Sequence, residues 1–499
     1  GDVALVNTGA LALGLSSVAG NYSITNTGSI TTSGALALNG ASSTITATDA
    51  LDDITISNAI TRTSTSAGTL TIAAPRNIGF TTGGSVLATG AGALAVTLNA
   101  DTDEDLDGAI AMGAGTFITS NNGNIRLGGG ADPGDDPAIS VTDGVAGVDL
   151  NNANLTAGAG SITIAGIGAA GTDGNAGVLI RGGAQLTADG GILITGTGGD
   201  GSGINNDGIV IIGAGTLIET AGAGGITLIG TRGTGTSSNR GILMDSGAIV
   251  RSTATGTGAI LLTTISGVTT TGSGNVGISV AGGSKVESLN ATGGSSITLE
   301  GYGGAGTGVN NGVNIANGTI STVSGEISIT GVGGGDGGLS GTFNNGISID
   351  TGALVQTSGA GGITLTGTRG SGVTSNIGVL VDGATVRSTA TGTGAILLSA
   401  DGGGTIEPEG TDNVGVLIRN AGVVESLKAS GGSTITLAGT GGSDGSTGGD
   451  NSGVVITGVS SRVSSVSGDI TITGIGGTGN GGETNHGVQI ASSGANSAP

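Results

Sequence analysis

The residues with the clearest capacity for chemistry form one short acidic run. Asp101, Asp103, Asp105 and Asp107 alternate along the chain, and Gly108 follows them. Alternate carboxylates followed by glycine can wrap oxygen ligands around a hard cation such as Ca²⁺. No glutamate closes the loop at its twelfth position and no helical pattern flanks it, so a solvated acidic loop is the alternative. We expect calcium or a solvated loop here, and no cofactor that the fold requires.

The other groups that could do chemistry are dispersed. A second acidic group within residues 132–143 has less regular spacing, and the only histidine, His486, stands in a turn without partners for a triad or a metal site. Glycoside hydrolases need paired carboxylates in a cleft, and lyases need a basic residue beside an acidic metal site. The 13 Lys and Arg residues are spread over 499 positions. We therefore expect that the protein is not an enzyme.

The composition excludes several classes of protein. Glycine accounts for 112 residues, aromatic side chains for 1%, the net charge is −22 and there is no cysteine. Disulfide frameworks and cysteine metal sites are thus impossible. The negative charge and the scarcity of stacking aromatics argue against nucleic-acid binding. No apolar stretch is long enough for a transmembrane helix, so we expect no membrane insertion.

The elements that must position these residues come from a repeat. An asparagine, any residue, a glycine and then an aliphatic segment recur about every 34 residues. The ten asparagines are Asn175, Asn206, Asn239, Asn275, Asn310, Asn344, Asn376, Asn413, Asn451 and Asn485. Each repeat contains three short segments in which aliphatic residues alternate with others, as in Val178–Ile180 or Ile162/Ile164. Such alternation is typical of strands with one buried face.

Three short strands per repeat predict an all-β fold, a right-handed parallel β-helix of about 15 coils. The asparagine column then becomes a ladder of stacked amides that donate to and accept from neighbours about 4.8 Å away. The glycine two residues later supplies a backbone shape that a Cβ would obstruct. Opposite charges one coil apart, Arg251 with Glu287 and Arg387 with Glu425, should attract across the stack.

The organisation along the chain has two parts. Residues 1–176 contain less regular coils of roughly 25–39 residues without the asparagine ladder. Residues 177–499 contain regular coils with a four-coil super-repeat, in copies 177–311 and 312–452 and a partial copy 453–499. Gly/Thr/Ser/Asp loops such as 230–240, 331–345 and 439–452 should project from one edge.

One stretch resembles a known family. It begins with Leu98-Asn99-Ala100-Asp101 and Gly108-Ala109-Ile110, and continues as Ile118-Thr119-Ser120-Asn121-Asn122-Gly123-Asn124-Ile125-Arg126-Leu127-Gly128-Gly129-Gly130. It is similar to the repeat region of filamentous-haemagglutinin-like large bacterial exoproteins. The resemblance implies a secreted protein or an adhesin at the bacterial cell surface.

Two functions follow as hypotheses. A structural fibre or stalk needs regular repetition, whereas an adhesin or glycan-binding module needs a distinctive loop cluster on the Gly/Asp-rich edge. The near absence of aromatics favours the structural role. The expected partner is another copy or more of the same chain, joined end to end, with surface glycans or cell receptors as alternatives. A threonine column that includes Thr163 and Thr227 also suits ice binding, but Leu193 interrupts it.

Overall fold

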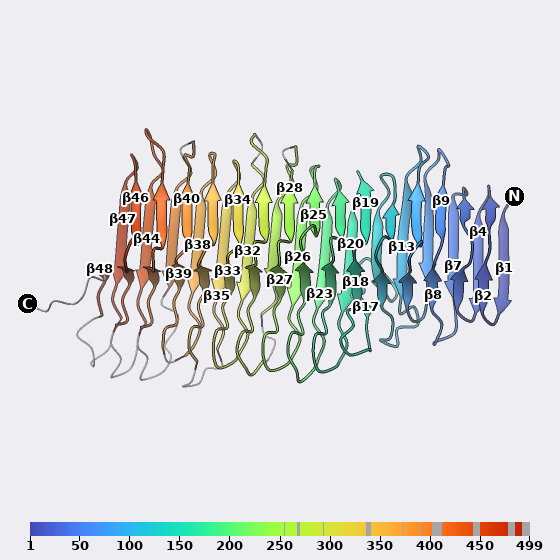
Figure 1. The fold of residues 1–499 in the computed structure, drawn as a ribbon, viewed down its shortest axis with the longest axis horizontal. Coiled ribbons are helices and arrows are strands. Elements are labelled where there is room, and N and C mark those ends of the chain that lie inside the picture. The colour runs from blue at the N-terminus through green and yellow to red at the C-terminus, as the bar shows by residue number, and fades with distance from the viewer. Residues whose placement is uncertain are drawn as a thin grey trace, which may run out of the picture. The chain divides into compact units, whose positions relative to one another are not determined.

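The computed structural model describes residues 1–253, 255–266, 270–292, 294–335, 341–372, 374–389, 391–401, 412–442, 450–477 and 485–491. Parts of the predicted loop edge, residues 336–340 and 443–449, lie outside the described residues. The chain forms two compact units, Gly1–Gly233 and Thr234–Pro499. Each unit is a parallel β-helix with three strands per coil, which confirms the predicted fold class (Figure 1).

In the first unit, coils run through three parallel sheets. Sheet I contains β1 (Val3–Thr8), β4 (Tyr22–Thr27), β7 (Ser42–Ala47), β10 (Gly68–Ala73), β13 (Leu94–Ala100), β16 (Ile125–Gly129), β17 (Ala138–Ile139), β20 (Ile162–Ile167), β23 (Ile192–Thr197) and β26 (Ile226–Thr231). Sheet II contains β2 (Leu11–Leu13), β5 (Ile30–Thr32), β8 (Ile54–Ile56), β11 (Ile78–Phe80), β14 (Ile110–Met112), β18 (Val148–Asn151), β21 (Val178–Arg181) and β24 (Ile209–Ile212). Sheet III contains β3 (Ser16–Val18), β6 (Leu36–Leu38), β9 (Ala59–Arg62), β12 (Ser85–Ala88), β15 (Phe117–Thr119), β19 (Asn154–Gly158), β22 (Gln185–Ala188) and β25 (Leu217–Thr220).

The strands of the second unit also belong to three parallel sheets. Sheet I contains β29 (Ile260–Thr264), β32 (Ile297–Tyr302), β35 (Ile327–Val332), β38 (Ile363–Thr368), β41 (Ile396–Asp401), β44 (Ile435–Thr440) and β47 (Ile470–Ile475). Sheet II contains β27 (Ile242–Asp245), β30 (Ile278–Ala281), β33 (Val313–Ala316), β36 (Ile347–Asp350), β39 (Val379–Asp382), β42 (Val416–Arg419), β45 (Val454–Thr457) and β48 (Val488–Ala491). Sheet III contains β28 (Ile249–Ser252), β31 (Lys285–Ser288), β34 (Thr319–Thr322), β37 (Leu354–Thr357), β40 (Thr385–Ser388), β43 (Val423–Ser426) and β46 (Arg462–Ser465).

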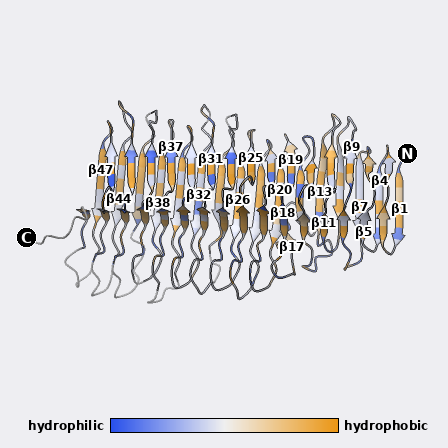
Figure 2. Ribbon diagram, viewed as in Figure 1, coloured by the Kyte–Doolittle hydropathy of each residue, from blue (hydrophilic) through white to orange (hydrophobic). Residues whose placement is uncertain are grey.

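The core of each unit is a stack of aliphatic side chains. In the first unit Ile162 pairs in register with Ile192, and both are 2% exposed or less. In the second unit Ile297 pairs with Ile327, and both are equally buried. Hydrophobic residues are concentrated in the strands, whereas the connections are less hydrophobic (Figure 2). Because strand residues alternate in direction, every second residue reaches this core.

Near the start of the chain, the coils are shorter than the sequence predicts. The described residues give sheet II eight strands in each unit, so the two units hold about 16 coils against the expected 15. Leu11, Ile30, Ile54 and Ile78 occupy one column and are 19, 24 and 24 residues apart. These spacings are shorter than the expected 25–39 residues because the connections from sheet I to sheet II contain only a few residues there.

Candidate functional site

The asparagine column lies where the loop edge returns to sheet II. Each asparagine precedes the first residue of a sheet II strand by three positions, as Asn310 precedes Val313 of β33. Nine of the ten side chains are at most 4% exposed, and Asn485 is half-buried. A buried amide has to form hydrogen bonds or pay a desolvation cost, so this column is the main polar structure of the loop edge.

The amides form a ladder between adjacent coils of each unit. In eight pairs of successive asparagines, the backbone N–H of the first donates to the side-chain Oδ1 of the second. The N–O distances are 3.2 Å for Asn175 to Asn206, 3.1 Å for Asn239 to Asn275, 3.0 Å for Asn275 to Asn310, 3.1 Å for Asn310 to Asn344, 2.9 Å for Asn344 to Asn376, 3.1 Å for Asn376 to Asn413, 3.0 Å for Asn413 to Asn451 and 2.9 Å for Asn451 to Asn485. The side chain thus satisfies a buried backbone donor, which the sequence did not reveal.

Amide-to-amide bonds, which the sequence predicts throughout, occur at some rungs. Nδ2 of Asn310 donates to Oδ1 of Asn344 at 3.2 Å, and Nδ2 of Asn376 donates to Asn413 at 3.1 Å. Nδ2 of Asn344 instead donates to the backbone carbonyl of Ser371 at 2.7 Å. One Oδ1 can accept both bonds because a carbonyl oxygen has two lone pairs. The acceptor of the Nδ2 hydrogen bond therefore differs from coil to coil, whereas Oδ1 accepts a backbone N–H at each of these rungs.

Glycines flank the ladder because two backbone segments touch there. A Cβ on Gly312 would overlap the backbone nitrogen of Val332, and one on Gly196 would overlap the carbonyl oxygen of Gly208. The loop thus leaves sheet I and returns to sheet II through a neck that has no room for side chains. The glycine of each repeat is needed for this close approach.

A second ladder with the opposite direction stands beside the first. Oδ1 of Asn311 accepts from the backbone N–H of Asn345 at 3.0 Å, and Oδ1 of Asn345 accepts from Ile377 at 2.9 Å. In the same column the N–H of His486 donates to Oγ of Ser452 at 3.2 Å. His486 is exposed and lies in the segment that leads into β48. The doubled asparagines at 310–311 and 344–345 were the signal that sequence reasoning missed.

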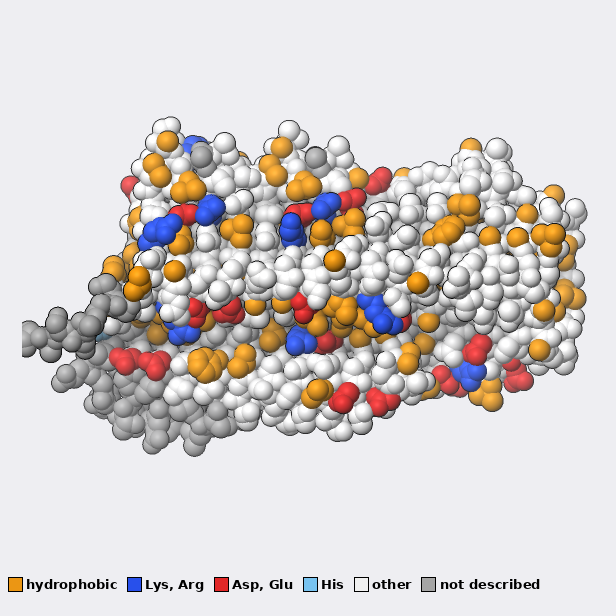
Figure 3. All heavy atoms as spheres, in the orientation of Figure 1, with side chains coloured by type: hydrophobic (Ala, Val, Ile, Leu, Met, Phe, Trp, Pro, Cys, Tyr) orange, Lys and Arg blue, Asp and Glu red, His pale blue; other side chains and the backbone are white. Residues whose placement is uncertain are grey.

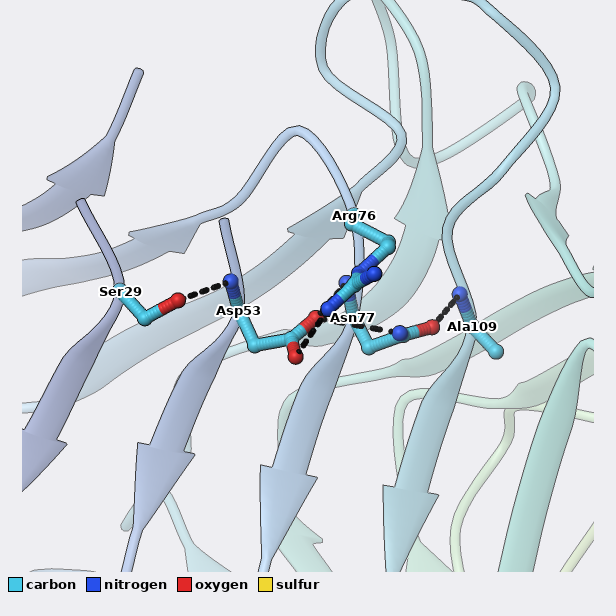
Figure 4. Close-up of polar contacts among 5 residues, drawn as sticks. All are labelled: Ser29, Asp53, Arg76, Asn77 and Ala109. Atoms are coloured by element: carbon cyan, nitrogen blue, oxygen red, sulfur yellow. Dashed lines mark hydrogen bonds and ion pairs between the residues drawn. The ribbon is translucent and has the colours of Figure 1, made fainter. Parts of the chain in front are cut away.

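The first unit has a related network near its start. Oγ of Ser29 accepts from the N–H of Asp53, Oδ1 of Asp53 accepts from that of Asn77, and Oδ1 of Asn77 accepts from that of Ala109 (Figure 4). Arg76 adds two hydrogen bonds to Asp53, at 2.8 and 2.7 Å. Although burial opposes ionisation, the bonds from Arg76 and Asn77 hold the pKa of Asp53 below its usual value. Mixed side chains therefore serve here in place of an asparagine column.

The acidic run brings three of its four aspartates together. One carboxylate oxygen from each of Asp101, Asp103 and Asp105 lies within 4.8 Å of the others. Asp101 is 2% exposed, and its Oδ1 accepts from the N–H of Leu106 at 3.1 Å. Burial raises the pKa of Asp101 to about 6, and the charge of Asp105 adds to this effect against the opposing Leu106 hydrogen bond.

The fourth predicted ligand, Asp107, is not part of this group. Its backbone N–H donates to Oδ1 of Asp105 at 3.1 Å, and burial raises the pKa of its carboxyl although Arg76 opposes that shift. The second acidic group of residues 132–143 does not bring three carboxylates together in this way among the described residues. Its Asp143 accepts from Nδ2 of Asn175 at 3.1 Å, at the first rung of the ladder. Among the described residues, the Asp101 group is therefore the one arrangement suited to a cation.

Ion pairs join adjacent coils on the outer face of sheet III. In the second unit Arg251 pairs with Glu287 and Arg387 with Glu425, both at 2.7 Å, as the charge pattern predicts. Arg462 pairs with the other oxygen of Glu425 at 2.8 Å, a contact that the sequence analysis did not include. Acidic and basic side chains adjoin one another on a mostly uncharged surface (Figure 3).

A cavity of about 410 Å³ lies beside sheet II of the second unit. Its apolar lining includes Ile377, Val414, Leu417 and Val455, which also form one buried cluster. Arg419 lines the same cavity. This cavity is one place among the described residues that could receive a small ligand.

Comparison with protein-family models, curated protein sequences and solved structures found no match to this chain. Among the residues that the structure describes, no helix is long and apolar enough to cross a membrane.

Proposed function

We propose that this protein is a structural β-solenoid, secreted by a bacterium, that forms part of a fibre or stalk at the cell surface. The observation that carries the proposal is the in-register stacking of coils within each unit, where side chains such as Asn344 accept hydrogen bonds from the backbone of the neighbouring coil. In such a repeat each coil contacts only adjacent coils, so length can grow without a new core. In this proposal the role is non-catalytic, and the buried polar groups of the ladder hold coils together.

The bacterial and extracellular parts of the proposal rest on the resemblance of residues 98–130 to filamentous-haemagglutinin-like exoproteins. The repetition supports a structural role, because both units are built from coils with the same three-strand arrangement. The net charge of −22 suits a surface protein that has to remain dispersed.

The proposed partner is the same kind of coil, from a longer chain or from another copy. Among the described residues, β1 pairs only with β4 and β47 pairs only with β44. Leu5 on β1 is 39% exposed although its register partner Ile24 is 1% exposed, and Ile470 on β47 is 42% exposed although its partner Ile435 is fully buried. A further coil against either strand would pair its backbone and cover apolar surface.

Immuno-electron microscopy of native material tests the location. Antibodies against this chain should label filaments or stalks outside the cell, and label confined to the cell interior would contradict the proposal. Sedimentation of the isolated 499-residue chain tests the partner. Concentration-dependent end-to-end association is expected, whereas a monomer with both terminal coils protected from hydrogen exchange would contradict it.

An adhesin or glycan-binding module is the second candidate, and the cavity beside sheet II of the second unit favours it. Surface glycans and the receptors of a host or neighbouring cell are the partners in that case. Binding to a glycan array that Leu417→Glu abolishes, with the fold retained, would support this function. Equal binding by the unmodified chain and the variant would remove the cavity from consideration.

A further inference from the structure

A column of hydroxyl side chains lies inside the second unit, at the corner between sheets III and I. Each member is the last residue of a sheet III strand, and neighbours pair in register from coil to coil. The members are Ser252, Ser288, Thr322, Thr357, Ser388 and Ser426, and each is at most 2% exposed. Residues two positions earlier, such as Val286 and Val355, are aliphatic core. The column is therefore a polar line through an otherwise apolar interior.

Partnered and unpartnered hydroxyls alternate along this column. Ser252 donates to Oγ of Ser295 at 3.4 Å, and Thr322 donates to the carbonyl of Gly325 at 2.6 Å. Ser388 shares a hydrogen bond with Ser433 at 3.1 Å. Among the residues that the structure describes, the buried hydroxyls of Ser288, Thr357 and Ser426 have no hydrogen-bond partner. Because a buried hydroxyl without a partner is costly, three of them in one line require an explanation.

The spacing of the coils suggests what the partner is. Paired strands lie about 4.8 Å apart, so hydroxyl oxygens of adjacent coils with the same side-chain conformation have about this separation. That distance is too long for a direct hydrogen bond, which needs about 2.8 Å between oxygens. One water molecule placed 2.8 Å from both oxygens would bridge them at an angle of about 120°, which suits hydrogen bonding to water. The strand spacing thus matches a hydroxyl–water–hydroxyl bridge.

We propose that ordered internal water molecules occupy this column and bridge hydroxyls of adjacent coils. The donor count balances: Thr357 donates to a water, and that water donates to Thr322, whose own proton is used by Gly325. Ser288 reaches Thr322 from the other side in the same way, and Ser426 reaches Ser388. Buried waters usually have two to four polar partners, and each bridge gives a water the hydroxyls of two adjacent coils.

Thr357→Val tests the bridge, because valine keeps the shape of threonine and removes the hydroxyl. With a water bridge, the substitution breaks hydrogen bonds, and we expect the melting temperature of the full chain to fall by about 1–3 °C. Thr322→Val is the matched control, since its hydroxyl has a protein acceptor and its loss should lower the melting temperature in any case. If Thr357→Val raises the melting temperature or leaves it unchanged, the Thr357 hydroxyl is not bound to an ordered water and the proposal is wrong.

A second measurement does not depend on how a variant folds. A high-resolution crystal structure of the unmodified chain should contain water density beside Ser288, Thr357 and Ser426. Magnetic relaxation dispersion should detect long-lived waters, and Ser426→Ala should reduce their number. Density for water beside these hydroxyls supports the proposal, and its lack beside all three overturns it.

Discussion

At the scale of single residues, asparagine combines two properties that the ladder needs. Its side chain is short enough to stay within the loop edge, and its amide offers an acceptor with two lone pairs beside two donors. Oδ1 of Asn344 accepts from both the backbone and the side chain of Asn310. Removal of such a side chain leaves a buried backbone N–H without an acceptor.

Asn344→Ala is therefore expected to lower the free energy of unfolding by about 1–3 kcal/mol, the cost of an unsatisfied buried donor. Asn314→Ala is the control, because Asn314 lies on the outer face of β33 and is only half-buried. Urea denaturation of both variants gives the comparison. Equal stability of the two variants would contradict the structural role of the ladder.

The calcium hypothesis is tested at Asp101, Asp103 and Asp105. A bound cation would offset the repulsion between three carboxylates whose ligand oxygens lie within 4.8 Å. Calcium should then raise the melting temperature, EDTA should reverse the rise, and Asp103→Asn should remove it. Asp132→Asn serves as the control outside the group. If calcium leaves the melting temperature unchanged, the run is a solvated loop.

Asp350 gives a pH dependence of defined sign. Burial raises the pKa of its carboxyl, with nearby Asp382 adding to this effect, while the Ser348 hydrogen bond and Arg419 oppose it. The folded state thus binds more protons than the unfolded state above about pH 4, and this group reduces stability as pH rises. Asp350→Asn should raise the melting temperature at pH 7 and have little effect near pH 4.

Asp382→Asn is the matched control for that experiment. Asp382 pairs with Arg419 at 2.8 Å, so its neutralisation at pH 7 should lower the melting temperature. A fall with Asp350→Asn at pH 7 would show that the ionised Asp350 is stabilised by its neighbours, contrary to the expected sign.

At the scale of elements, the neck requires glycine because its backbone segments touch, whereas a strand does not. The neck brings the end of a sheet I strand against the start of the next sheet II strand, with backbone touching backbone. Within sheet II, by contrast, Gly79 of β11 has open space around the position of a Cβ. Glycine is thus required by contact at the neck and is merely tolerated in the strand.

Gly196→Ala should destabilise the first unit by about 1–3 kcal/mol, because the new methyl group would meet the carbonyl oxygen of Gly208. Gly79→Ala in the same unit should be neutral or stabilise it by about 0.4–1 kcal/mol, since it restricts the unfolded chain. Thermal unfolding followed by circular dichroism measures both. Tolerance of Gly196→Ala would mean that the neck can widen.

At the scale of the whole molecule, the net charge of −22 governs how copies approach one another. Repulsion between them is screened within about 10 Å in 0.1 M salt and about 3 Å in 1 M salt. Light scattering should therefore increase when NaCl is raised from 0.01 M to 1 M, as copies associate side by side. Scattering that stays constant over this range would argue that charge does not keep the copies apart.

The sequence by itself determined the fold class and the alignment of the coils. Alternating residues such as Ile162 and Ile164 specify strands, and an asparagine at a constant offset marks the same corner in each coil, so both can be seen from spacing alone. The ion pair of Arg387 with Glu425 followed from the same alignment. A repeat defines which residues share a column, because neighbouring coils must match in register.

The tertiary structure alone decided which atoms meet within each column. Spacing could not reveal that Oδ1 of Asn344 accepts a backbone N–H, that Asp107 stands apart from Asp101, or that Thr357 lies in a buried line of hydroxyls. Contacts of about 3 Å depend on the path of each loop, and positive φ values at Asp101 and Leu106 turn the acidic run back on itself. Such turns are set by local backbone geometry and packing, which the repeat pattern does not encode.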